Sequence, residues 1–162
     1  MKKRFFSVIT SFVALCTMMA VSVVDAKASE ELKCVDGSYL TTEESSTGRT
    51  MSKTRGIYLM TGDCSITKAG LSRVYSYAST TANQKVNYMA TTVYVDQYNE
   101  DIDKWGQIYA WSEEAENDYY MSTAKTVTVE RGYYYRVRAR HIVGDKYPYE
   151  ETASFTNGIL LP

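Results

Sequence analysis

Residues 133–143 alternate between two kinds of side chain, and this alternation limits the possible fold more than any other feature of the sequence. Odd positions are mainly apolar, whereas the even positions include Arg136, Arg138 and Arg140. Side chains of a β-strand point alternately to the two faces of its sheet, so the odd positions should face a core and the arginines should face water. A shift of one residue would bury all three guanidinium groups, so the register is strongly specified.

The same period of two recurs through most of residues 56–162. Runs rich in Val, Thr and Tyr are separated there by turn signals such as Asn-Gly and Gly-Asp, and the acidic stretch 113–118 is interpreted as one of these turns. The expected strands are 57–67, 71–79, 85–98, 105–111, 119–129, 132–143 and 150–160. Seven short strands without a sustained helical period predict an all-β domain over 56–162, built as an antiparallel β-sandwich.

The first 28 residues have the organisation of an export signal. Lys2-Lys3-Arg4 is a positive start, an apolar run follows over 5–24, and Ala26-Lys27-Ala28 is a cleavage site of small residues. The apolar run is about as long as a membrane span, so an uncleaved anchor is the alternative. Because no basic stop follows the run, we expect cleavage, secretion from a Gram-positive bacterium and no membrane contact afterwards.

A polar segment, residues 29–55, follows the signal. It is rich in Ser, Thr, Glu and Lys and has almost no apolar periodicity, a composition that does not bury enough surface to become ordered. We therefore expect a flexible spacer. Cys34 lies in it and Cys64 lies in the first expected strand. Cleavage of the signal would remove Cys16, so these two cysteines would remain. An even number of cysteines in an exported chain suggests one disulfide between them, and two free thiols are the alternative.

Charge and chemistry exclude several classes of function. The formal net charge is −1, and residues 1–28 hold more basic than acidic groups, so the remainder is more acidic and unlike a nucleic-acid-binding protein. His141 is the single histidine, which excludes a multi-histidine zinc site, and a packed, hydrogen-bonded side chain is its simplest interpretation. The acidic loop 99–103 lacks the Gly and the distal Glu of a calcium loop. We expect no catalytic residue, cofactor or metal.

Two resemblances to known families depend on particular residues. Residues 126–141 contain a Gly, then a Tyr, then an alternating V-x-A run, and resemble the penultimate strand region of immunoglobulin-like and fibronectin type III modules. A second set comprises Arg55-Gly56-Ile57-Tyr58-Leu59, Gly62, Ser65-Ile66, Ala69-Gly70, Val93-Tyr94-Val95, Trp105, 132–138, His141 and 151–159. Through this set, residues 55–160 resemble a family of small uncharacterised secreted proteins of Clostridia and related Firmicutes. That resemblance implies export and a sandwich fold, and no activity.

A surface rich in tyrosine and arginine suggests a function. In an immunoglobulin-like sandwich, strand 85–98 would lie beside strand 132–143, and their outward residues would share one surface. This expected Tyr/Arg face consists of Tyr88, Tyr94, Tyr98, Tyr134, Arg136, Arg138 and Arg140. Tyr and Arg are frequent in binding hot spots, and aromatic rings stack on sugars. Cross-strand pairs also stabilise a sheet by themselves, by roughly 0.2–1 kcal/mol each, so a purely structural role is the alternative.

The resulting hypothesis is a secreted, non-catalytic binding module whose partner is a glycan or a protein. A structural protein whose exposed edge strands pair between copies is the second hypothesis. A small hydrolase that depends on an acidic residue or on His141 is the third.

Overall fold

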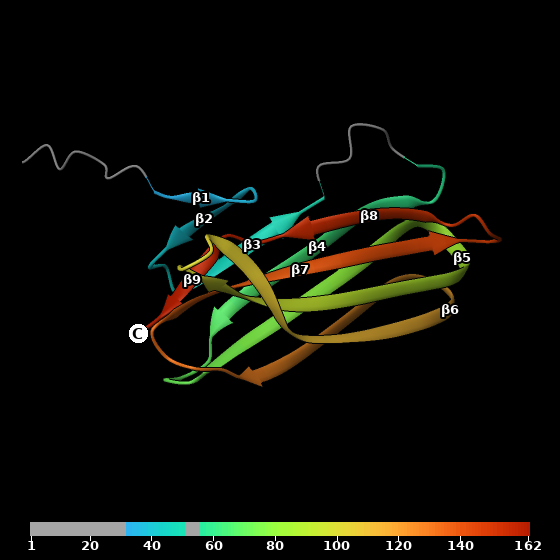
Figure 1. Ribbon diagram of the computed structural model, residues 1–162. Coiled ribbons are helices and arrows are strands. Elements are labelled where there is room, and N and C mark those ends of the chain that lie inside the picture. The colour runs from blue at the N-terminus through green and yellow to red at the C-terminus, as the bar shows by residue number, and fades with distance from the viewer. Residues whose placement is uncertain (1–31, 51–55) are drawn as a thin grey trace, which may run out of the picture. The chain divides into compact units, whose positions relative to one another are not determined.

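The described part of the chain is built from strands alone (Figure 1). The structure is a computed structural model that describes residues 32–50 and 56–162, and these residues confirm the prediction of an all-β protein. Their strands are β1 Cys34–Val35, β2 Ser38–Thr41, β3 Ser45–Arg49, β4 Leu59–Lys68, β5 Arg73–Asn99, β6 Lys104–Thr128, β7 Tyr133–Gly144, β8 Glu150–Phe155 and β9 Gly158–Leu161. No helix in these two ranges has the length and apolarity that crossing a membrane requires. The expected signal, residues 1–28, lies outside them.

The strands form one continuous sheet in place of the two separate sheets that were expected. Its order is β1-β2-β9-β7-β5-β4-β3, with β6 beside β5 and β8 beside β7. The first part of β5 pairs with β4 and the second part with β7, so this one strand joins the two parts of the sheet. The sheet curls over itself, and Figure 1 shows β8 returning close to β3.

Two expected turns are absent because β5 and β6 are unusually long, at 27 and 25 residues. Strands 71–79 and 85–98 are parts of β5, which bends where its pairing with β6 is interrupted between Thr81 and Val86. The acidic stretch 113–118 lies within β6. In the described residues β6 pairs with β5 alone, so it is an edge strand, where exposed charged side chains are readily accommodated.

The prediction of a flexible spacer over 29–55 is wrong for residues 34–49, which form β1, β2 and β3. β1 and β2 form a hairpin, β2 runs parallel to β9, and β3 pairs with β4. These strands are short and bury few apolar side chains, chiefly Val35 and Leu40, so they have no apolar period to detect. Main-chain pairing with distant strands orders them instead.

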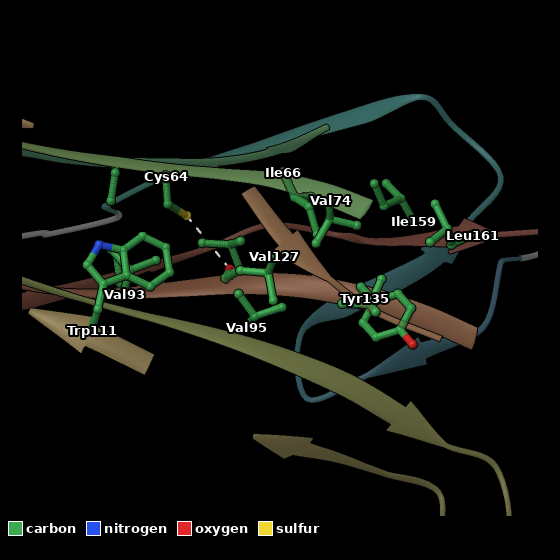
Figure 2. Close-up of a cluster of buried hydrophobic side chains, with 14 residues drawn as sticks. Cys64, Ile66, Val74, Val93, Val95, Trp111, Val127, Tyr135, Ile159 and Leu161 are labelled. Carbon is green, nitrogen blue, oxygen red and sulfur yellow. Dashed lines mark hydrogen bonds between the residues drawn. The ribbon is translucent and has the colours of Figure 1, made fainter. Parts of the chain in front are cut away.

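The core fills the inside of the curled sheet (Figure 2). Val93 and Val95 of β5 and Val137 of β7 are fully buried there, together with Ile66 of β4. The prediction for β7 is confirmed at positions 135, 137, 139, 141 and 143, all of which are buried, whereas Tyr133 at the start of the strand is exposed. The outer faces of β5 and β7 are therefore the surface to search for a functional site.

Candidate binding face

β5 and β7 bring the predicted residues together on one surface. The two strands are antiparallel, with Tyr94 opposite Arg138, Asp96 opposite Arg136 and Thr92 opposite Arg140. Directly opposed residues point to the same face, so the expected neighbourhood of strands 85–98 and 132–143 is confirmed.

Asp96 is the centre of this surface, although the sequence analysis did not select it. Its carboxylate accepts hydrogen bonds from Arg136 Nε at 3.1 Å, from Arg138 Nε at 2.5 Å and from Arg138 Nη2 at 3.0 Å. The Asp96 side chain is only 2% exposed, so its carboxylate is shielded from water. The available signal was that Asp96 shares the outward period of β5 with Tyr94 and Tyr98.

The β1–β2 hairpin covers one half of the Tyr/Arg face. Arg136 donates to the Ser38 hydroxyl at 3.0 Å and to the Asp36 carbonyl at 3.3 Å, and its guanidinium lies 4.6 Å from the centre of the Trp105 ring. As a result Arg136 is 6% exposed. The expectation that it faces water is therefore wrong, because residues assigned to a spacer are packed over it.

Tyr98 and Tyr134 lie under the same cover. Tyr98 is 2% exposed, and its hydroxyl lies 2.7 Å from Lys33 Nζ and donates to Asp103 Oδ1 at 2.7 Å. Tyr134 is half-buried and packs edge-on against Tyr98, with ring centres 6.4 Å apart. A ligand on the surface would therefore not reach Tyr98.

The other half of the face is open and hollowed. The Arg138 side chain is 40% exposed, and its guanidinium lies 4.9 Å from the centre of the Tyr94 ring. Ala153 of β8 stands opposite Arg140, and Phe155 stands opposite Arg138. Because Ala153 is small, a hollow of about 230 Å³ remains. Its lining is Tyr94, Arg138, Ala139, Arg140, Glu151, Ala153, Ser154 and Phe155.

Two further groups extend this surface, of which the first borders the hollow and the second lies beyond it. Glu151 accepts two hydrogen bonds from Arg140, each 2.5 Å long, and these hydrogen bonds, with a smaller contribution from the Arg140 charge, lower the pKa of Glu151. At the other end, the Tyr88 ring stacks on Tyr149 at 4.8 Å, and Tyr147, which is 84% exposed, packs edge-on against Tyr149. We call Tyr88, Tyr94, Arg138, Arg140, Glu151 and Phe155 the open half. The sequence does not reveal Glu151 and Phe155 because it does not fix the register of β8.

His141 lies on the opposite, inner face of β7, where it is hydrogen-bonded as expected. Its Nδ1 lies 2.8 Å from the Thr80 hydroxyl and its Nε2 lies 2.8 Å from the Ser154 hydroxyl. Thr80 in turn lies 2.5 Å from the Thr91 hydroxyl. Burial lowers the pKa of His141 to about 4, so the ring is neutral near pH 7.

This neutral histidine predicts loss of stability in mild acid. The unfolded chain binds a proton at His141 near pH 6.5, whereas the folded chain does so only near pH 4, so the free energy of unfolding should fall as the pH is lowered through this window. A difference of this size corresponds to at most about 3 kcal/mol. Urea unfolding between pH 4 and 7 measures it. The His141→Gln variant should have a shallower pH dependence, and an unchanged one would contradict the assignment.

Both cysteines in the described residues are free thiols, so the expected Cys34–Cys64 disulfide is not formed. Cys64 lies in the core on β4, with its sulfur 3.8 Å from the Val137 carbonyl oxygen (Figure 2), whereas Cys34 is exposed on β1. In the sheet, β2, β9, β7 and β5 separate β1 from β4. Burial raises the pKa of Cys64 to about 11, which keeps this thiol protonated.

Comparison with known proteins adds two findings. A family model, described as a family of unknown function, matches residues 13–159. A search of curated proteins gives no match. The match covers most of the chain, including every residue of the open half, and it brings no activity with it.

Proposed function

The chain belongs to this family, DUF6147, and because its description assigns no activity, we propose a function from the geometry: a non-catalytic protein that binds a glycan or a protein through the open half. In this proposal the protein is exported by a Gram-positive bacterium, as the pattern of residues 1–28 suggests.

The observation that carries the proposal is the hollow between Arg138, Arg140 and Phe155. The two guanidiniums on its border are fixed by carboxylates, Arg138 by Asp96 and Arg140 by Glu151. Groups that are already held in place lose little conformational freedom when they bind a ligand, which favours affinity. Fixed, partly exposed Arg and aromatic side chains around a hollow are typical of binding hot spots.

The absence of catalysis is part of the proposal. Ser154 and His141 lie within hydrogen-bond distance, as a nucleophile and its base would. Ser154 borders the hollow, but its hydroxyl is directed to His141 on the inner face of β7, and both residues are at most 1% exposed. A substrate in the hollow would therefore not reach the hydroxyl or the imidazole without local unfolding.

A double variant tests the binding face. We expect Tyr94→Ala with Arg138→Glu to lower affinity for the partner at least about tenfold, because both groups border the hollow. Glycan-array binding and pull-down from cell-envelope extracts identify the partner and measure the loss. The matched control is Tyr75→Ala with Arg73→Glu, two exposed residues on the first part of β5. If the Tyr94→Ala, Arg138→Glu variant binds the partner as well as the natural chain does, the proposal is wrong.

A second candidate function is self-assembly, and the β6 edge favours it. In the described part of the chain β6 has one paired side, which leaves a row of main-chain groups available to a second copy. Exposed Glu113, Glu114 and Glu116 on this edge oppose such pairing through charge repulsion. We therefore expect the variant with all three changed to Gln to associate more than the natural chain in sedimentation experiments. If both chains remain monomeric at high concentration, self-assembly through β6 is rejected.

A further inference from the structure

The ion pairs of the Tyr/Arg face leave one positive charge unbalanced. Within residues 32–50 and 56–162, Asp96 is the single carboxylate that forms ion pairs with Arg136 and Arg138. Glu151 is already engaged by Arg140 through two hydrogen bonds, so it does not balance the second guanidinium. Asp36 acts on Arg136 from an exposed turn, where solvent weakens its effect. The excess charge therefore lies on the Arg136–Asp96–Arg138 group.

The accessible part of this charge is at Arg138. Arg136 is buried beneath the β1–β2 hairpin, whereas the Arg138 side chain is 40% exposed at the border of the hollow. Arg138 uses Nε and Nη2 to bind Asp96, and within the described residues its Nη1 has no hydrogen-bond partner. A guanidinium with an unused N–H beside a hollow is suited to an anionic oxygen, because such charge-assisted bonds are the stronger ones.

The surroundings favour a ring-shaped, extended ligand. The hollow, at about 230 Å³, is smaller than the roughly 300–1,000 Å³ of drug-sized sites, and it is open to solvent beside the exposed ring of Phe155. Tyr88 lies six positions before Tyr94, about 20 Å along β5; the Tyr149 ring is stacked on Tyr88, and the Tyr147 ring packs edge-on against Tyr149. A linear ligand with repeated rings would use both the hollow and these aromatic side chains.

We infer that the open half binds an acidic polysaccharide, with a uronate carboxylate of one sugar on Arg138 and the ring of that sugar in the hollow beside Phe155. This inference rests on the proposed binding function and specifies its ligand class. Arg140 remains paired with Glu151, and the two together present a donor and an acceptor to the hydroxyl groups of the next sugar.

The test compares each polymer with its own neutral form. Polygalacturonate and hyaluronan are run beside carboxyl-reduced samples, in which every carboxylate has become a CH₂OH group, in affinity electrophoresis with the full chain. We expect retardation by at least one acidic polymer and about tenfold weaker binding to its reduced form. The Arg138→Gln variant should bind the acidic polymer more weakly by the same factor. Arg73 is an exposed arginine on the first part of β5, and the Arg73→Gln variant should bind as the natural chain does.

Several outcomes would overturn the inference. Equal binding to acidic and reduced polymers would reject an acidic ligand but leave glycan binding standing, and equal losses in Arg138→Gln and Arg73→Gln would indicate unspecific attraction. Failure to bind either acidic polymer would reject the uronate ligand, while capture of a protein partner in the pull-down would keep the proposed function. Arg138→Lys, which keeps the charge, should retain the preference for acidic polymers. If Arg138→Gln does not fold, the binding of the natural chain to acidic and to carboxyl-reduced polymers still tests the inference.

Discussion

Replacing Asp96 by alanine should destabilise the protein more than any other single change on the Tyr/Arg face. The substitution leaves two guanidiniums without their carboxylate, and Arg136 is almost fully buried beneath the β1–β2 hairpin. Removing one partner of a buried ion pair typically costs about 3–5 kcal/mol, because the remaining charge is desolvated and unpaired. Denaturant unfolding at pH 7 measures the loss.

The control for this prediction is a solvent-exposed ion pair of the same protein. Asp63→Ala breaks the pair with Arg49, whose side chain is largely exposed, and exposed pairs contribute about 0–1 kcal/mol. The Asp96 variant should therefore lose several times more stability than the Asp63 variant. Similar losses would mean that Asp96 does not hold the covered half together.

Gly62→Ala should be the most damaging change in the interior near His141. A Cβ atom on Gly62 would lie 2.3 Å from the His141 ring, which is fixed between Thr80 and Ser154. The ring is fully buried and hydrogen-bonded through both nitrogens, so the substitution combines overpacking of about 1–3 kcal/mol with loss of hydrogen bonds worth about 1 kcal/mol each. We expect a decrease of roughly 3–4 kcal/mol in the free energy of unfolding.

Gly106→Ala is the matched control for this change. Gly106 also lies in a strand, but a Cβ atom there would have its nearest neighbour at 3.8 Å, an ordinary contact distance. Because alanine also restricts the unfolded chain, this variant should be as stable as the natural protein or slightly more stable. If the two alanine variants have equal stability, close packing of Gly62 against His141 is wrong.

The sequence predicted the parts of this molecule that local alternation determines. The register of β7 followed from the contrast between arginines and apolar residues, and the pairing of β7 with the second part of β5 agreed with the expected neighbourhood. The position of His141 in the interior followed from the same alternation.

The parts that were missed depend on contacts between distant segments. The β1–β2 hairpin covers Arg136 across about a hundred residues of sequence, and no periodicity in 29–55 reveals it. The register of β8, which places Phe155 beside Arg138, depends on a loop whose geometry the sequence does not state. The prediction of a turn at 113–118 was wrong because an exposed edge strand and a turn have the same polar composition.

The parallel pairing of β2 with β9 has a consequence for the order of assembly. Leu40 pairs with Gly158 and Thr41 with Ile159, so one of the first strands to be synthesised finds its partner only when almost the whole chain is available. Pairing between such distant segments is slow, because a large loop must close before any contact forms. The β1–β2 hairpin over Arg136 is therefore expected to be among the last parts of the protein to fold. A chain truncated before residue 158 would lack the partner strand of this hairpin and would leave Arg136 uncovered.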